Sequence, residues 1–152
     1  MRRVATFGVT SCQREPEPRI TLVRKDSDET VNFDAATLIA QYQLPSGDIV
    51  LILDEDCPYE EQLHLALVRG SDVLDHIVIG APYATGDYRE VALGEKELRF
   101  RFSGDTELLL AVRDKASHLP ERLPAGARRL GRWFSAHHLS LQQSAPNEHQ
   151  TA

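Results

Sequence analysis

The sequence predicts a mainly β fold: an antiparallel β-sandwich or partly open barrel of about seven to nine strands, with one amphipathic C-terminal helix. Three observations predict it. Between residues 19 and 112, short runs rich in leucine and β-branched residues alternate with turn residues. Several runs are apolar at every position, which is typical of strands buried on both faces. Residues 127–141 instead carry apolar side chains at helical spacing. That helix places the fold at the margin between the mainly β and the α+β classes.

A length of 152 residues suits a single domain. We expect an extended N-terminal arm over residues 1–18, a β-rich domain over 19–141 that includes the helix, and a disordered tail over 142–152. The arm ends in Pro16 and Pro18, which keep the backbone extended and cannot donate hydrogen bonds to a sheet. The composition of residues 35–43 would suit a helix, but the apolar side chains in it alternate, so we favour a strand.

The apolar pattern differs from strand to strand. Residues 49–53, 77–79 and 108–112 are apolar throughout, whereas 63–67 and 98–102 alternate. A strand with one face in water should alternate, and a strand covered on both faces need not. We therefore expect apolar surface on both sides of the sheet, which the C-terminal segment or a neighbouring molecule must cover.

The hairpin around residues 104–106 has a predicted register. A three-residue loop there places Phe100 opposite Leu110, and such cross-strand apolar pairs stabilise a sheet. This register leaves Leu109 on the same face as Arg101, where we expect an apolar segment to cover it.

The predicted helix is a candidate for that cover. The apolar face comprises Leu130, Trp133, Phe134, His137 and Leu141. Gly126 and Gly131 weaken the start of such a helix by roughly 1 kcal/mol each relative to alanine. Burial of the Trp133 and Phe134 rings on the sheet would offset that cost, at about 25 cal/mol per Å² of apolar surface.

Composition excludes several classes of function. The net charge of −6 argues against nucleic-acid binding, which needs an excess of Lys and Arg to meet the phosphates. No stretch approaches the roughly 18 apolar residues of a membrane-spanning helix, and two cysteines do not make a disulfide framework. We expect a cytoplasmic protein with no cofactor, and the sequence contains no P-loop, dinucleotide fingerprint or nucleophile elbow.

The acidic run after residues 49–53 is a weak candidate for a metal site. Asp54 and Asp56 supply the oxygen ligands that hard cations prefer. The run lacks the spaced ligands of a calcium loop, and alternate residues of a strand point to opposite faces. A solvated strand end is the more common interpretation.

A second weak candidate comprises His64, Asp75 and His76. If the strands around residues 62–68 and 73–79 pair through the turn between them, the two histidines lie close together. Two histidines and an aspartate can bind zinc or act as acid and base. A histidine facing outward from a strand is far more common than a ligand, and Cys57, a possible nucleophile, has no evident base beside it.

The remaining candidates suit recognition rather than chemistry. Tyrosines on loops offer large amphipathic contacts, as Tyr83 and Tyr88 would. A charged outer face with Arg99 and Arg101 and the helix residues Trp133 and Phe134 complete the set of predicted binding residues. For the charged face, a solvated surface is the simplest interpretation.

Three hypotheses of function follow. The first is a non-enzymatic binding or protein-interaction module, acting through a sheet face, the tyrosine loop or the C-terminal helix on a protein partner or a second copy. The second is a barrel that binds a small apolar ligand. The third is a metal-dependent or acid/base hydrolase around His64, Asp75 and His76.

Overall fold

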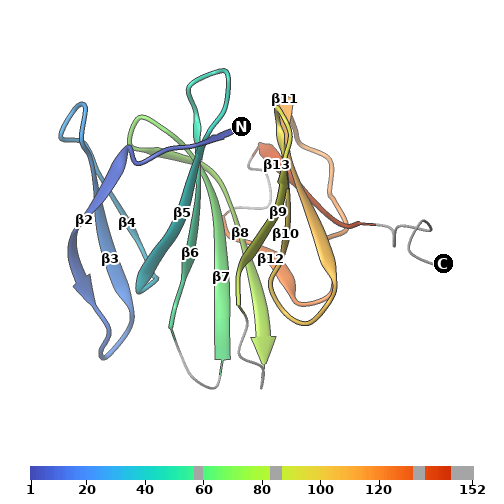
Figure 1. The fold of residues 1–152 in the computed structure, drawn as a ribbon, viewed down its shortest axis with the longest axis horizontal. Coiled ribbons are helices and arrows are strands. Elements are labelled where there is room, and N and C mark those ends of the chain that lie inside the picture. The colour runs from blue at the N-terminus through green and yellow to red at the C-terminus, as the bar shows by residue number, and fades with distance from the viewer. Residues whose placement is uncertain (57–59, 83–86, 132–135, 145–152) are drawn as a thin grey trace.

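A computed structural model describes residues 1–56, 60–82, 87–131 and 136–144. These residues form thirteen strands and no helix (Figure 1). Every strand pair in them is antiparallel. The prediction of a mainly β, antiparallel fold is confirmed. The strands are more numerous than expected, because several short ones pair over only two to five residues.

The largest sheet has six strands. Their spatial order is β1 (Arg2–Arg3), β5 (Thr37–Gln43), β6 (Ile49–Asp54), β7 (Glu60–Arg69), β8 (Asp72–Pro82) and β12 (Ala127–Arg129). The strand β5 confirms the extended interpretation of residues 35–43. The strands β5 to β8 follow one another as a meander, so local hairpins build most of this sheet.

Two smaller sheets cover it. One contains β2 (Phe7–Gln13), β3 (Arg19–Arg24) and β4 (Thr30–Phe33), and the other contains β13 (His137–Gln143), β11 (Glu107–Ser117), β10 (Glu97–Arg101) and β9 (Arg89–Leu93). Figure 1 shows the six-stranded sheet between them. The prediction of a single sandwich or barrel is therefore wrong, because the chain forms three sheets.

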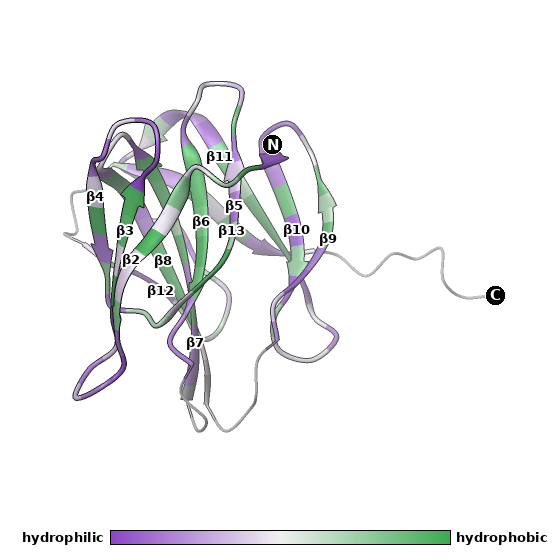
Figure 2. Cartoon of the chain, turned by 60° about the vertical axis from the view of Figure 1, so that its left-hand side comes forward, coloured by the Kyte–Doolittle hydropathy of each residue, from purple (hydrophilic) through white to green (hydrophobic). Residues whose placement is uncertain are grey.

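The strand β6 lies at the centre of the molecule. Val50 and Ile52 belong to the apolar cluster shared with the four-stranded sheet, and Ile49, Leu51 and Leu53 belong to the cluster shared with the three-stranded sheet. All five are fully buried, and the strand is hydrophobic along its length in Figure 2. This confirms that the strand without alternation is covered on both faces. The cover comes from the same chain.

The N-terminal segment is extended, as expected, but it is built into two sheets. Its strand β1 pairs with β5, and its strand β2 pairs with β3. At the start of β2, the backbone of Phe7 is hydrogen-bonded by the Gln41 side chain instead of by a neighbouring strand. The Gln41 Oε1 accepts from the Phe7 N–H at 2.8 Å, and the Gln41 Nε2 donates to the Phe7 carbonyl at 2.9 Å. Residues 2–3 and 7–13 are thus strands of two sheets rather than parts of a free arm.

The predicted helix over residues 127–141 is wrong. Within the described part of this segment, β12 pairs with β8 and β13 pairs with β11. Gly126 and Gly131 have φ angles of 86° and 111°, which a right-handed helix does not contain. Leu139 and Leu141 alternate with half-buried residues and point into the core, which is the period of a strand.

Some residues of the C-terminal predictions cannot be compared with the structure. Trp133 and Phe134 lie outside the described residues, as do 145–152 of the predicted tail. Gln142 and Gln143, which we assigned to that tail, are the last residues of β13.

The hairpin of β10 and β11 differs from its predicted register by two residues. Phe100 lies opposite Leu108 rather than Leu110, because Phe102 leaves the ladder and packs into the core. A shift of two residues preserves the faces of a strand. Leu109 therefore shares a face with Arg101, as expected, and it is half-buried there.

Candidate functional site

The two predicted histidines are brought together on one face of the central sheet. His64 on β7 and His76 on β8 lie diagonally across the ladder, with 2.8 Å between His64 Nδ1 and His76 Nε2. His64 Nε2 lies 3.0 Å from Glu55 Oε1. A carboxylate only accepts hydrogen bonds, so His64 Nε2 carries the proton and His64 Nδ1 accepts from His76. The result is a hydrogen-bonded chain from Glu55 through His64 to His76.

This chain is enclosed by the three-stranded sheet. His64 is only 2% exposed, and the Phe33 ring meets the His76 ring edge-on with 5.6 Å between centroids. Burial lowers the pKa of His76 to about 4, and the neighbouring His64 and Arg128 act in the same direction. His76 is therefore neutral at pH 7, and with so low a pKa it is a weak base toward the proton of a substrate.

Asp75 does not join the histidines. Adjacent residues of a strand point to opposite faces, and Asp75 contacts His76 only through the backbone N–H at 2.9 Å. Its carboxylate faces the four-stranded sheet, where Oδ2 accepts from the N–H groups of His138 and Leu139 at 2.9 and 2.8 Å. Oδ1 accepts from Arg129 Nε at 3.0 Å. The predicted set of His64, Asp75 and His76 is therefore divided between two layers.

The acidic residues after β6 have separate surroundings. Asp56 forms an exposed ion pair with Arg14 at 2.7 Å. Burial, followed by the charge of Asp56, raises the pKa of Asp54. Within the described ranges, no group of three His, Cys, Asp or Glu side chains has the arrangement of a metal site.

Tyr88 packs instead of projecting from its loop. Its ring lies 5.5 Å from the Phe100 ring, and its hydroxyl lies 2.7 Å from the Tyr42 hydroxyl, which donates to Glu90 Oε1 at 2.7 Å. Burial raises the pKa of Tyr88 to about 12. Tyr88 thus links β5 of the six-stranded sheet to β10 of the four-stranded sheet.

Within the described residues, the predicted binding residues Arg99 and Arg101 make only long ion pairs. Arg99 and Arg101 lie on the outer face of the four-stranded sheet, half-exposed, with loose ion pairs of 3.9 and 3.7 Å to Glu107. Exposed pairs of this kind contribute little. Tyr83 and Cys57 lie outside the described residues.

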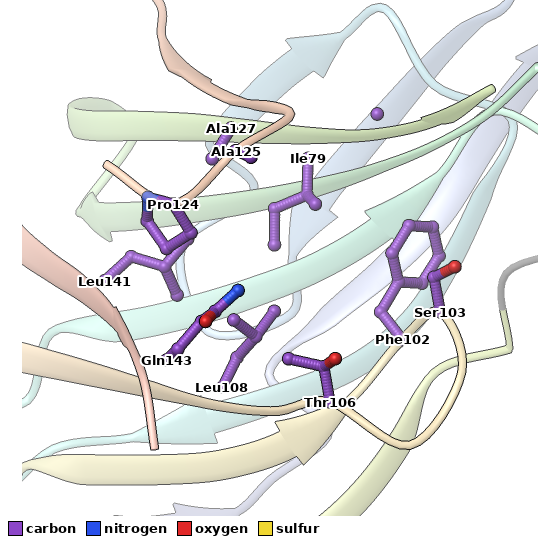
Figure 3. A pocket seen from close by; sticks show the side chains of 11 residues that line it. Ile79, Phe102, Ser103, Thr106, Leu108, Pro124, Ala125, Ala127, Leu141 and Gln143 are labelled. Carbon is purple, nitrogen blue, oxygen red and sulfur yellow. The ribbon is translucent and has the colours of Figure 1, made fainter. Parts of the chain in front are cut away.

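The structure shows a hollow that the sequence did not predict. It lies at one end of the space between the six- and four-stranded sheets and has a volume of about 260 Å³. Figure 3 shows the apolar side chains that surround it and the polar ones at its border. The apolar lining comprises Ile79, Phe102, Leu108, Pro124, Ala125, Ala127 and Leu141, and the polar side chains are Ser103, Thr106 and Gln143.

A close backbone contact shapes one wall of this hollow, which we call the end pocket. The Gly80 N–H donates to the Gly126 carbonyl at 2.9 Å. A Cβ atom on Gly126 would lie only 3.0 Å from the Gly80 carbonyl oxygen, and the φ angle of Gly126 is 86°. Glycine at position 126 therefore allows the chain to turn tightly into β12 beside the pocket.

A shallower groove of about 450 Å³ adjoins the end pocket. Four of its lining residues also line the pocket: Pro124, Ala125, Leu141 and Gln143. The groove adds Arg122, Leu123 and Gln142. The two hollows thus meet over the segment before β12 and the end of β13.

Sequence reasoning missed these features for different reasons. Glu55 lies two residues after Leu53, on the face that β6 shares with His64, so strand periodicity alone could have found it. The end pocket is assembled from β8, β11, β12, β13 and the loops before β11 and β12. No local pattern signals such an assembly, because its parts are far apart in sequence.

No known protein family, curated protein or solved structure matches this chain. In the described part of the chain, no helix is long and apolar enough to cross a membrane.

Proposed function

We propose that this protein is a non-enzymatic binding protein that takes the apolar part of a small molecule into the end pocket. The observation that carries the proposal is an opening of about 260 Å³ at the end of the apolar core, lined mainly by apolar side chains. Binding sites for small molecules have this character: concave, mostly apolar, with a few polar groups that fix orientation.

The size of the pocket limits the ligand. A cavity of about 150 Å³ is enough for benzene, so the end pocket suits a single ring or a short hydrocarbon chain. The side chains of Ser103, Thr106 and Gln143 can donate or accept hydrogen bonds at its border. We therefore expect an amphipathic ligand rather than a pure hydrocarbon.

Acid/base catalysis has less support than binding. His64 is buried, His76 is half-buried, and both are hydrogen-bonded within the chain from Glu55 to His76. The Asp75 carboxylate lies on the opposite face of β8 and already accepts four hydrogen bonds. A general base needs an open path to the proton that it removes.

Filling the pocket tests the proposal. Ala125 is exposed at the pocket and lies outside the apolar core clusters, so Ala125→Trp should occupy the opening while the fold stays intact. We expect 1-octanol to shift the methyl NMR signals of Ile79, Leu108 and Leu141 in the unmodified protein. In Ala125→Trp, those shifts should be lost.

The matched control is Val9→Trp, a large residue at a 51% exposed position on the three-stranded sheet. It should leave octanol binding unchanged. Octanol shifts that are absent in the unmodified protein, or that persist equally in Ala125→Trp, contradict the proposed function.

A protein partner at β9 is a second candidate. All five residues of this edge strand are exposed, including Val91 and Leu93, and β9 lies at the outside of the molecule in Figure 2. An exposed edge strand offers backbone groups to an extended segment of another chain. A second copy of this protein supplies such a segment in its own β9.

Sedimentation tests the second candidate. We expect a reversible dimer at high protein concentration, and Val91→Lys should shift it to monomer because lysine on an edge opposes strand pairing. Val73→Lys, at a similarly exposed valine on β8, is the control and should retain the dimer. A monomer at every concentration rules out self-association through β9.

A further inference from the structure

The end pocket and the groove beside it form one path for an elongated ligand. They share the residues on either side of their junction, Pro124 and Ala125 from the segment before β12 and Leu141 and Gln143 from β13. A molecule with its apolar part in the pocket can extend across these shared residues. Its remaining atoms then lie in the groove.

The groove has one charged side chain, and it is positive. Among the described residues that line the two hollows, Arg122 alone carries a charge. It is exposed, and within the described ranges its guanidinium makes none of the ion pairs or hydrogen bonds that other arginines make. The guanidinium is therefore available to a ligand.

Glu121, the acidic residue next to Arg122, does not neutralise the charge of Arg122. Glu121 turns inward, where Oε1 accepts from the Ser140 hydroxyl at 2.8 Å. Its Oε2 lies 3.3 Å from Arg113 Nη2 and 3.7 Å from Arg129 Nη2. These contacts hold the segment that carries Arg122 against β13, so Arg122 is positioned at the groove while its acidic neighbour points away.

We infer that the ligand of the end pocket is an amphipathic organic anion, a carboxylate whose apolar body fills the pocket and whose charge pairs with Arg122. This inference rests on the proposed function. A guanidinium matches a carboxylate through two parallel N–H···O bonds. Burial of the apolar body supplies most of the affinity, and Arg122 selects the sign of the headgroup.

The expected selectivity is modest because Arg122 is exposed. Exposed ion pairs contribute about 0.2–1 kcal/mol, which corresponds to about a 1.4- to 5-fold preference. We expect octanoate to bind about 1.4- to 5-fold more tightly than 1-octanol at low ionic strength, and octylamine to bind more weakly than either. The preference should shrink in 1 M salt, where the Debye length falls to about 3 Å.

Titration calorimetry of the full chain with these three probes tests the inference. Arg122→Gln should remove the preference for octanoate and leave the affinity for octanol unchanged. Arg19→Gln is the matched control: it removes a positive charge from an exposed position on the three-stranded sheet and should retain the preference.

The outcomes separate the inference from the proposed function. Equal affinities for octanoate and octanol, or a preference for octylamine, overturn the anion assignment while the binding function stands. A preference for octanoate that persists in Arg122→Gln also overturns it. If none of the three probes binds, the proposed function fails and the inference fails with it.

Discussion

Asp75 and His76 are neighbours in the sequence, yet their side chains hold different layers together. His76 lies against Phe33 and His64 on the side of the three-stranded sheet, and Asp75 accepts from the backbone of β13 on the other side. The alternation of a strand produces this division. Two adjacent polar residues thus stabilise two separate interfaces of the central sheet.

His76 should make stability depend on pH. Its pKa is about 4 in the folded protein, against the ordinary histidine value of 6.5 that applies to the unfolded chain. Between these two values the unfolded chain binds a proton that the folded chain does not. The contribution of neutral His76 to the free energy of unfolding is therefore fully present above pH 6.5 and is lost as the pH falls through 4. We expect a loss of at most about 3 kcal/mol, since each pKa unit corresponds to roughly 1.4 kcal/mol.

Urea unfolding of His76→Gln from pH 7 to pH 4 isolates this contribution. Glutamine retains a donor for His64 Nδ1 but does not titrate, so the variant should lose less stability than the unmodified protein over this range. His118→Gln, at an exposed position, should follow the unmodified protein. If the free energy of unfolding falls equally with pH in all three proteins, His76 is not the source of the pH dependence.

The strand β12 owes its place to contacts with β8 and β13 more than to its own length. β12 has only three residues, and Arg129 within it reaches both the Asp75 carboxylate at 3.0 Å and the Leu139 carbonyl at 2.6 Å. These bonds connect β8, β12 and β13. A buried carboxylate therefore takes the place of a regular ladder between the edges of two sheets.

Asp75→Asn should weaken this connection strongly. Asparagine has the same shape, but its amide cannot accept all four hydrogen bonds, and it leaves Arg129 with only the longer ion pair to Glu121 at 3.7 Å. Breaking one partner of a buried pair costs about 3–5 kcal/mol, and we expect a loss of that order in urea unfolding. Asp105→Asn, in an exposed turn, should change stability by less than about 0.5 kcal/mol, and equal effects of the two variants would refute this role of Asp75.

At the scale of the whole molecule, the central sheet is buried because a smaller sheet packs on each of its two faces. The apolar cluster on one side of β6 is shared with the three-stranded sheet and that on the other with the four-stranded sheet. The prediction that the apolar surface needs cover is confirmed, and most of this cover comes from the N-terminal segment, β4, β10, β11 and β13. A neighbouring molecule is not needed for it, so self-association rests on β9 alone.

The amino-acid pattern was enough to predict strands, their faces and the burial of β6, because the two-residue period of a strand is a local property of the chain. It also placed His64 near His76 and kept Leu109 on the correct face although the hairpin register differed by two residues. Packing between segments far apart in the chain determined the other features of the fold and of the site. Glycines with positive φ angles turned an apparent helix into two strands, Gln41 joined two sheets, and four segments far apart in the sequence left a pocket beside Arg122. Such features depend on which segments meet in space, and contacts between segments far apart in the chain leave no periodic pattern in either of them.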